Sequence, residues 1–265
     1  MGKGKKQIAK ASLGIAIIAR NAEKTIGACL DSIVPYVEQV VVCVDETTTD
    51  KTAAVARKHG AEVHMSHKVS DWHECPDHGR VLVQHFADAR QASFAHLRKD
   101  LDFHGWLDAD DVVEGGEKIP EVLSRLGPEV AGVWLSYHYA KAGNHGPTST
   151  LFDLERFVRS STPFQWQFRV HEILIPVGRP TESLNWTRTD AVRVVHQHIG
   201  HDTAASARRN ITLLEIDLEE NPNDMRAWFY LGNQWFALNE WEQAAVCYER
   251  ATESTNPYQL WQTLI

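Results

Sequence analysis

The strongest constraint on the fold is an alternation of strand and helix patterns in the first 65 residues. Ser12–Ala19 and Gln39–Val44 are almost continuous apolar runs, which is typical of parallel strands buried on both faces. Between them, the apolar side chains of 26–33 recur every three or four residues, as on one face of a helix. A second helix, ending at Lys58, and a short strand at Ala61–His64 complete the series. This β-α-β-α-β order predicts an α/β fold with a parallel sheet.

The rest of the chain divides into an irregular middle and a helical end. The pattern predicts a polar, histidine-rich loop over Ser66–His85. A change in composition near residue 201 separates strand-like segments from a stretch that has helical patterns throughout. We therefore expect a flexible basic N-terminus at 1–11, an α/β domain at 12–201 and a helical region at 202–265.

The helical region contains one candidate repeat. Small and large apolar residues stand there at the positions of the tetratricopeptide consensus, whose period is about 34 residues. The matching residues are Trp228, Leu231, Gly232, Trp235, Ala244, Tyr248 and Ala251. An ordinary amphipathic helical hairpin is the alternative interpretation. Because a single repeat cannot bury its own apolar face, we expect it to pack on a helix at Thr203–Glu220 and on Tyr258–Ile265.

Charge and hydropathy argue against several classes of protein. Thirty-five acidic and 27 basic residues give a net charge of −8, opposite in sign to that of most proteins that bind a nucleic-acid backbone. No stretch approaches the roughly 20 apolar residues of a transmembrane helix. The basic start resembles a secretory signal, but the apolar run Leu13–Ala19 is short and ends at Arg20. With four cysteines that lack paired spacing, these features lead us to expect a soluble, cytoplasmic protein.

The most informative polar cluster is Asp108-Ala109-Asp110, which follows a short predicted strand at His104–Leu107. Open α/β sheets bind ligands at the carboxyl ends of their strands. Carboxylates that meet there need a counter-charge, and oxygen ligands suit Mg²⁺ or Mn²⁺. A metal in that place would also bind a diphosphate. A solvated acidic turn is the alternative interpretation.

A second acidic residue ends another predicted strand. Asp45 follows Gln39–Val44, so we expect it at the same sheet edge as Asp108. Its carboxylate can accept a hydrogen bond from the N3–H of a uracil ring. The backbone of Ala19 and Arg20, at the end of the first strand, would form the neighbouring wall of such a site.

The run from Ser12 to Leu126 resembles the nucleotide-binding half of the family 2 glycosyltransferases, which have the GT-A fold. The resemblance rests on IAIIARNAEKTIGACLDSI, VVVCVDETTTDKT, FADARQASF and GWLDADDVV, which match four family segments in order and spacing. It implies a Rossmann-like GT-A domain with a nucleotide-binding half at 12–126 and an acceptor-side half at 127–201. It also implies inverting transfer from a nucleotide-diphosphate sugar, with UDP favoured as the nucleotide and Mn²⁺ or Mg²⁺ as the cofactor.

The resemblance implies a role for each polar residue of the cluster. Asp45 would read the base, Arg90 would lie near the diphosphate, and Asp108 and Asp110 would meet the ribose and the metal. The sequence departs from the family at Gln91, where Asn is usual, and it lacks the Asp-Gly pair that is common after the first acidic residue. The candidate nucleotide-sugar site comprises Ala19, Arg20, Asp45, Arg90, Asp108, Ala109 and Arg169.

Further along, FRVHEILIP and HIGHD, followed by helices, are similar to a bacterial and phage subgroup that joins tetratricopeptide helices to the catalytic domain. In GT-A enzymes a late histidine often completes the metal shell. His198 fits that place beside Asp108 and Asp110, and an imidazole is a sensible ligand for manganese. The alternative is that His196, His198 or His201 is a surface residue at a strand end.

Inverting transfer needs a base that deprotonates the acceptor as it attacks the anomeric carbon. Glu172 is our candidate, with His171 and Arg169 close by in sequence to orient it or to hold phosphate. Asp111, adjacent to the acidic cluster, is the rival. A purely structural Glu172 is the third interpretation.

Two other functions remain open at this stage. A nucleotidyltransferase can share a related fold and a carboxylate-bound metal, but the turn Ala19–Ala22 lacks the glycines of a triphosphate loop. A non-catalytic adaptor would use the helical region to bind a partner. The acceptor of a glycosyltransferase is also open, and a tetratricopeptide surface would suit a protein or peptide.

Overall fold

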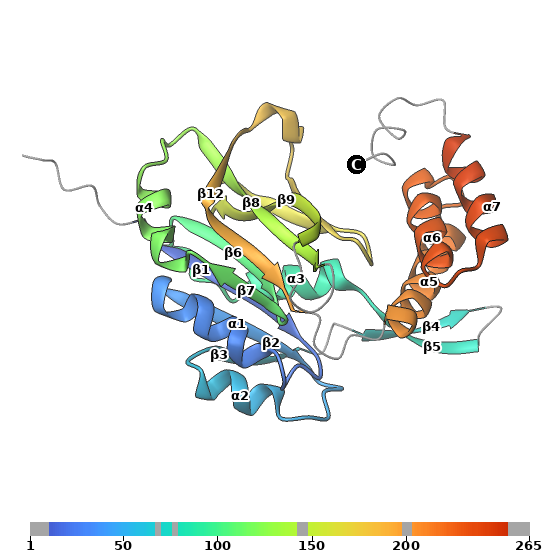
Figure 1. Ribbon diagram of the computed structural model, residues 1–265, viewed down its shortest axis with the longest axis horizontal. Helices are drawn as coiled ribbons and strands as arrows, with labels where there is room; N and C mark the ends of the chain where they lie inside the picture. Colours follow the sequence, from blue (N-terminus) through green and yellow to red (C-terminus); the bar gives the residue numbers. More distant parts are fainter. Residues whose placement is uncertain (1–10, 67–69, 76–78, 142–147, 198–202, 254–265) are drawn as a thin grey trace, which may run out of the picture. The chain divides into compact units, whose positions relative to one another are not determined.

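The computed structural model describes residues 11–66, 70–75, 79–141, 148–197 and 203–253 (Figure 1). The chain divides into two compact units. The first contains Met1–Lys68, Asp88–Gln167 and Ile173–Ile199, and the second contains Val69–Ala87, Phe168–Glu172 and Gly200–Ile265. The second unit thus combines the helical region with two stretches from the predicted 12–201 domain.

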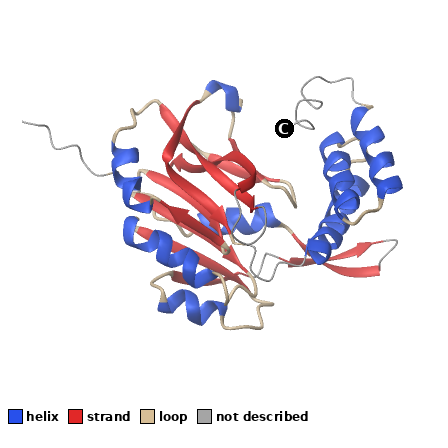
Figure 2. Ribbon diagram, in the orientation of Figure 1, coloured by secondary structure: helices blue, strands red, loops and turns tan. Residues whose placement is uncertain are grey.

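A mixed sheet of eight strands forms the first unit, with the order β3-β2-β1-β6-β9-β8-β12-β7 among the described residues (Figure 2). The strands are β1 (Leu13–Ala19), β2 (Gln39–Asp45), β3 (Glu62–Ser66), β6 (Phe103–Asp108), β7 (Asp111–Glu114), β8 (Val130–Lys141), β9 (Thr148–Arg159) and β12 (Asn185–His196). The other elements of this unit are α1 (Ile26–Ile33), η1 (Val34–Tyr36), α2 (Thr52–Lys58), η2 (Gly116–Lys118), α4 (Ile119–Ser124), β10 (Phe164–Gln167), β11 (Ile173–Pro176) and η3 (Thr181–Ser183). Helix α3 (Phe86–Phe94) begins in the second unit and continues into the first.

The parallel half of the sheet confirms the predicted β-α-β-α-β series. Strands β3, β2, β1 and β6 run parallel to one another. The side chains of β1 alternate between two layers: Ile15 and Ile17 pack with Leu30 of α1, whereas Ala16 faces Phe94 and Leu97 at the end of the α3 region. Both faces of the strand are covered, which explains its continuous apolar run.

The other half of the sheet brings distant segments to the end of β6. Strand β9 runs antiparallel to β6 and to β8, and β12 lies between β8 and β7. The chain leaves β6 at Asp108 and, after two intervening residues, enters β7, the strand at the far side of this half of the sheet. Strand β7 pairs antiparallel with β12, and Asp111 is opposite His196. This excursion joins the acidic cluster to the end of a strand that lies 85 residues later in the sequence.

The prediction of a loop over Ser66–His85 is wrong. Strands β4 (Ser70–Cys75) and β5 (Gly79–Gln84) form an antiparallel hairpin in register from the Ser70–Gln84 pair to the Cys75–Gly79 pair. Ladder hydrogen bonds join backbone groups and do not require apolar side chains. The polar composition therefore concealed a hairpin.

Three helices dominate the second unit: α5 (Thr203–Glu220), α6 (Met225–Ala237) and α7 (Trp241–Thr252). A Cβ atom on Gly232 of α6 would lie 2.6 Å from the ring of Tyr248 on α7, so the two helices approach closely at this glycine. The helical hairpin agrees with the predicted packing, whereas a tetratricopeptide assignment stays a prediction and Tyr258–Ile265 lies outside the described residues. Within the described part of the chain, every helix is too short or too polar to cross a bilayer.

Candidate active site

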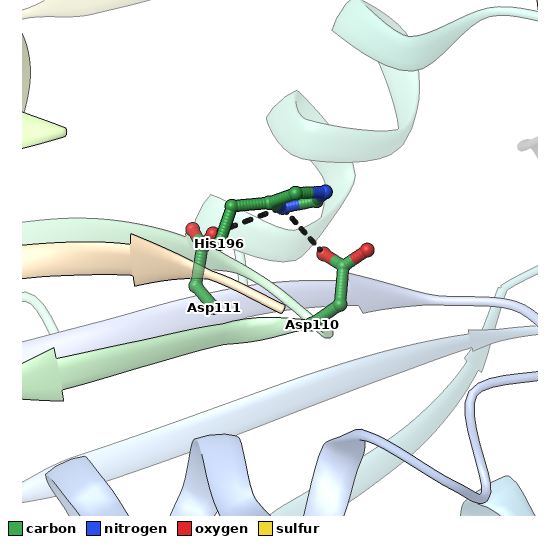
Figure 3. A group of neighbouring side chains, drawn as sticks. All are labelled: Asp110, Asp111 and His196. Atoms are coloured by element: carbon green, nitrogen blue, oxygen red, sulfur yellow. Dashed lines mark ion pairs between the residues drawn. The ribbon is translucent and has the colours of Figure 1, made fainter. Parts of the chain in front are cut away.

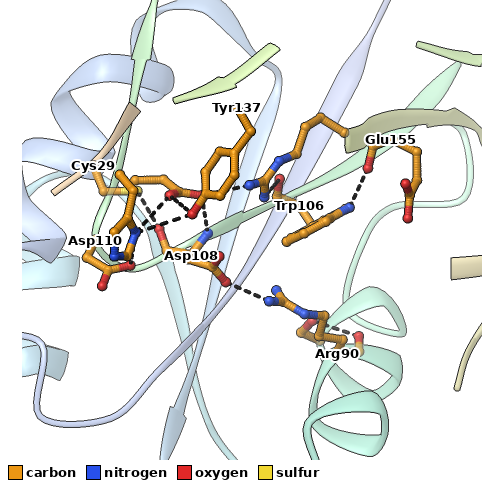
Figure 4. Close-up of polar contacts among 11 residues, drawn as sticks. Cys29, Arg90, Trp106, Asp108, Asp110, Tyr137 and Glu155 are labelled. Atoms are coloured by element: carbon orange, nitrogen blue, oxygen red, sulfur yellow. Dashed lines mark hydrogen bonds and ion pairs between the residues drawn. The ribbon is translucent and has the colours of Figure 1, made fainter. Parts of the chain in front are cut away.

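The acidic cluster lies at the carboxyl end of the parallel strands. Strand β6 ends at Asp108, a turn contains Ala109 and Asp110, and β7 begins at Asp111 (Figure 4). The backbone N–H of Asp108 donates to the Asp111 carboxylate across this turn, with a distance of 3.0 Å. The turn therefore fixes three acidic side chains within four residues.

Arg90 of α3 balances the first of these carboxylates. Its guanidinium donates to Oδ1 of Asp108 at 2.6 Å and lies over the ring of Trp106 at 4.2 Å. Burial of Asp108 acts to raise its pKa, but Arg90 and Arg156 outweigh that effect and lower the pKa below its ordinary value. Asp108 therefore stays ionised. Next to Arg90, the side chain of Gln91 accepts a hydrogen bond from the backbone N–H of Trp166 at 3.1 Å.

Asp110, Asp111 and His196 form a second group, in which the potential ligand atoms all lie within 4.8 Å of one another (Figure 3). Nδ1 of His196 is 3.6 Å from a carboxylate oxygen of Asp110 and 3.6 Å from one of Asp111. The pairing of β7 with β12 places the imidazole there. Both His196 and Asp111 are buried, while Asp110 is half-buried.

Asp111 is fully buried, and several groups compensate its charge. The hydroxyl of Tyr137 donates to its Oδ1 at 3.0 Å, and the Arg156 guanidinium lies 3.2 Å from its Oδ2. Arg156 is itself fully buried and lies over Trp106 at 3.7 Å. A buried carboxylate with such partners keeps a fixed position.

The electrostatic balance of the group favours a cation. Burial and the neighbouring charge of Asp108 raise the pKa of Asp110 to about 6. Burial acts to lower the pKa of His196, but Asp111, Asp110 and Asp108 outweigh it and raise that pKa. The neighbouring carboxylates contribute to both shifts, so negative charge is concentrated at this point. Two carboxylates and an imidazole are a donor set that suits Mn²⁺ or Mg²⁺, so these residues fit a divalent metal.

The predicted nucleotide-sugar residues of the first unit lie on neighbouring strands. Ala19 ends β1 and Asp45 ends β2, and both residues are buried. In the strand register, Ala19 is opposite Val44 and Ile18 is opposite Asp108. Arg20 is exposed and Ala109 half-buried. Oδ1 of Asp45 accepts hydrogen bonds from the backbone N–H and the hydroxyl of Thr47, at 2.7 and 2.6 Å. The structure thus brings Asp45 and Asp108 to the carboxyl ends of nearby parallel strands, on the same side of the sheet.

Other predicted residues lie elsewhere or are not described. Arg169 and Glu172 belong to the second unit. There Arg169 pairs with Asp217 and Glu220 of α5, which neutralise its charge locally. His198 lies outside the described residues, so its role as a ligand stays a prediction.

Sequence reasoning missed three contributors to the site. The sequence places His196 only as a surface residue at a strand end, whereas the structure buries it beside Asp110 and Asp111. No sequence motif indicates Tyr137 or Arg156. The available signal is the alternation in LFDLERFVR, where Arg156 shares one strand face with Leu154 and Val158, because a charged side chain on an apolar face needs a buried partner.

Fold and site together define a mixed α/β protein that carries a carboxylate–histidine group at its strand ends. Residues 14–181 match the family model described as Glycosyl transferase family 2. Because this match spans more than half of the 265 residues, the chain belongs to glycosyltransferase family 2. The protein is an enzyme, a nucleotide-sugar glycosyltransferase.

Comparisons with individual proteins give only distant similarity. No curated protein matches the sequence. Glucosyl-3-phosphoglycerate synthase from Mycobacterium tuberculosis, solved with Mn²⁺, UDP and phosphoglyceric acid, is 15% identical with a TM-score of 0.43; the match covers 79% of this chain and 78% of that one. The 1–349 fragment of TarS from S. aureus is 12% identical with a TM-score of 0.43, and the match covers 95% of this chain and 77% of that one.

Proposed function

We propose that this enzyme transfers a sugar from a UDP-sugar to an acceptor, with inversion at the anomeric carbon and with Mn²⁺ or Mg²⁺. The observation that carries the proposal is the Asp110–Asp111–His196 group beside the Arg90–Asp108 pair at the strand ends. A nucleotide diphosphate and a divalent cation together supply the charges that complement these groups. The family assignment favours this function over a nucleotidyltransferase or a non-catalytic adaptor.

In the proposed donor complex, Asp45 accepts the N3–H of uracil and the backbone of Ala19 and Arg20 lies beside the base. Support comes from the register of the strands, which puts these residues at the same edge as Asp108. Arg90 is the cation nearest to Asp108 and would meet the diphosphate. Ala109, in the turn, would contact the sugar-nucleotide through its backbone.

Asp110, Asp111 and His196 would hold the metal, with Asp108 or His198 as a further ligand. When bound, the metal would neutralise charge on the leaving diphosphate. The chain itself contributes a prearranged carboxylate: Tyr137 and Arg156 fix Asp111 before any ligand enters. Arg90 keeps Asp108 ionised at neutral pH by lowering its pKa against the effect of burial.

Glu172 is the proposed base, which removes the proton of the acceptor during attack. Asp111, the rival, is fully buried and accepts hydrogen bonds from Tyr137 and from the backbone N–H of Asp108. Such a carboxylate is poorly placed to receive a proton from an incoming substrate. This contrast supports Glu172, which is half-buried.

A protein or peptide is the proposed acceptor class, bound through the helices. Helices α5, α6 and α7 form a groove of about 620 Å³. Trp228 and Trp235 give it aromatic walls, and Glu215, Glu219 and Glu242 also line it. Aromatic surface with acidic neighbours suits a segment that has apolar and basic side chains.

Calorimetric titration of UDP, with and without Mn²⁺, tests the donor and metal sites. Asp110→Asn should abolish the Mn²⁺-dependent part of UDP binding and leave the fold intact, because Asp110 lies in a half-buried turn. Asp190→Asn, at an exposed carboxylate of the same unit, is the matched control. Equal UDP affinity in Asp110→Asn and wild type, at every Mn²⁺ concentration, would remove Asp110 from the metal site.

A further inference from the structure

The hairpin formed by β10 and β11 belongs to one unit, but its tip belongs to the other. The two strands are paired from Phe164–Pro176 to Gln167–Ile173. The segment between them, Phe168–Glu172, is grouped with the helices of the second unit. We call these five residues the hairpin tip. The proposed base, Glu172, is its last residue.

The backbone of the hairpin tip is strained. Phe168 has a φ of 73° and His171 a φ of 54°, which is the left-handed region that favours glycine. Phe168 is the outlier, because a bulky side chain rarely adopts a positive φ, whereas histidine adopts it more often than most residues. Such conformations persist only where contacts with the surrounding structure hold them, and they concentrate at functional sites.

Helix α5 and the start of α3 anchor the centre of the tip. The side chain of Val170 is buried in the core of the helical unit with Ile211, Leu214 and Leu231. The Arg169 guanidinium pairs with two carboxylates of α5. The carbonyl of Arg169 accepts a hydrogen bond from the backbone N–H of Phe86 at 2.9 Å. Side chain and backbone are therefore fixed at adjacent positions.

Arg226 of α6 contacts both left-handed residues at once. Its guanidinium lies 3.9 Å above the ring of Phe168, and it donates a hydrogen bond to the carbonyl of His171. The imidazole of His171 stacks on Tyr230, with 4.1 Å between ring centroids and an angle of 15°. The same guanidinium is 4.6 Å from the Tyr230 ring. Arg226 is buried, so these contacts are its fixed environment. Its charge also interacts with that of Glu172.

Strand β10 of the same hairpin contacts the donor site of the first unit. Trp166 of β10 packs edge-on against Trp106, with 5.3 Å between ring centroids. Arg90, which bonds Asp108, lies 5.2 Å from the Trp166 ring. The hairpin thus has a strand residue beside Arg90 and a tip that is fixed within the helical unit.

We propose that Arg226 is a positioning residue for sugar transfer. It holds the hairpin tip in its left-handed backbone conformation and so fixes the orientation of the Glu172 side chain. The inference rests on the proposed function, in which Glu172 is the base. It gives the helical unit a part in the transfer step, separate from any role in acceptor binding. Displacing a catalytic base by about 1 Å can lower the rate on the order of 10²-fold. Loss of the Arg226 contacts should therefore lower kcat strongly.

The test uses the full chain with Arg226→Ala and Arg226→Lys. Arg208→Ala, at an exposed arginine of α5, is the matched control. Three quantities are measured: amide hydrogen exchange across 165–176, UDP affinity with Mn²⁺, and kcat and KM for hydrolysis of a UDP-hexose. The donor is the one that wild type hydrolyses fastest among UDP-glucose, UDP-galactose and UDP-N-acetylglucosamine.

For Arg226→Ala we expect faster exchange at the tip and a decrease in kcat of about 10²-fold, with KM and UDP affinity within about twofold of wild type. Arg226→Lys keeps the charge but not the planar group, and should fall between Ala and wild type. The control should match wild type. A purely structural residue would instead lower kcat and UDP binding together.

Unchanged exchange and kcat in both Arg226 variants would overturn the proposal, as would parallel losses of kcat and UDP affinity. If Arg226→Ala does not fold, Arg226→Lys decides; loss of the folded circular dichroism signal in both would reduce the residue to a stabilising one and reject the positioning role. A wild-type enzyme that hydrolyses none of the three donors contradicts the proposed function instead. In that case the exchange measurement still decides whether Arg226 locks the tip.

Discussion

The strand-end site of the first unit and the hairpin tip of the second both depend on arginine–carboxylate pairs, but they balance charge differently. At the tip, Arg169 faces two carboxylates of α5. At the strand ends, the three acidic residues of the cluster face Arg90 and Arg156, and the pKa of Asp110 is raised to about 6. Each group has one carboxylate more than it has arginines. At the tip, Glu220 is exposed, so water screens the excess charge. At the strand ends, Asp111 is fully buried, so a bound cation would offset the excess there.

Of the changes that test the difference between the strand-end site and the hairpin tip, we expect the largest effect, a decrease in kcat, at the proposed base. Glu172→Gln keeps the size of the side chain but cannot accept the proton, so kcat should fall on the order of 10²- to 10⁴-fold while UDP affinity stays near wild type. Steady-state kinetics with a UDP-hexose and calorimetric titration of UDP measure the two quantities. Glu182→Gln, at an exposed glutamate of η3, serves as the control. Full activity in Glu172→Gln would pass the role to Asp111 or another group.

A second effect should appear when the buried arginine of the strand-end site is removed. Arg156→Met leaves the fully buried Asp111 without its cation, and breaking a buried pair costs about 3–5 kcal/mol in the free energy of unfolding. Urea unfolding followed by circular dichroism measures it. Mn²⁺ should restore part of the loss in Arg156→Met, because the metal supplies the missing positive charge.

Arg188→Met is the matched control for that experiment, since Arg188 pairs with Asp153 and Asp190 at the surface. Its unfolding should change little and should not respond to Mn²⁺. Equal destabilisation of the two variants would mean that the buried pair has no special importance. A loss in Arg156→Met that Mn²⁺ leaves unchanged would argue against metal binding at Asp111.

The smallest effect concerns pH and the hairpin tip. Burial, followed by the charges of Arg226 and Arg209, lowers the pKa of His171 to about 3. The unfolded chain binds this proton near the ordinary pKa of 6.5, whereas the folded chain does not until about 3. Stability is therefore full above about pH 6.5 and falls as the pH decreases toward 3, by on the order of 1 kcal/mol per pH unit.

The variant His171→Asn isolates this contribution, because asparagine tolerates a positive φ and does not titrate. Thermal unfolding of both proteins between pH 7.5 and 4.5 gives the comparison. The difference in Tm between wild type and variant should shift against wild type as the pH falls. A difference that is constant over this range would show that His171 is protonated equally in the folded and unfolded chains.

The parallel half of the sheet could be predicted because its signal is local. The apolar run of β1 and the helical spacing of α1 lie within single segments, and strand ends then locate Asp45 and Asp108. Parallel strands that are buried on both faces have few alternatives. Asp110 follows from the same pattern, whereas Arg90 is implied only by the resemblance to the family.

What could not be predicted depends on pairing between distant segments. His196 reaches Asp111 only because β7 joins the far side of the sheet, and three histidines within six residues give no local reason to prefer one. The burial of Val170 among the helices is likewise a long-range contact that no periodicity reveals. Gln234 of α6 is also buried, and its side-chain Nε2 lies 3.3 Å from Nε2 of His171.

Arg90 contacts both the acidic cluster and the hairpin strand β10, and this has a thermodynamic consequence. One guanidinium bonds Asp108 and also lies over Trp106 and Trp166. A ligand that moves Arg90 also changes the stacking of the Arg90 guanidinium on Trp166 of the hairpin. The free energy of ligand binding therefore includes the free energy of this change in stacking. By reciprocity, an ordered hairpin alters donor affinity by the same factor by which the donor alters the order of the hairpin. If the donor binds at Arg90 as proposed, this shared side chain couples donor binding to the order of the hairpin.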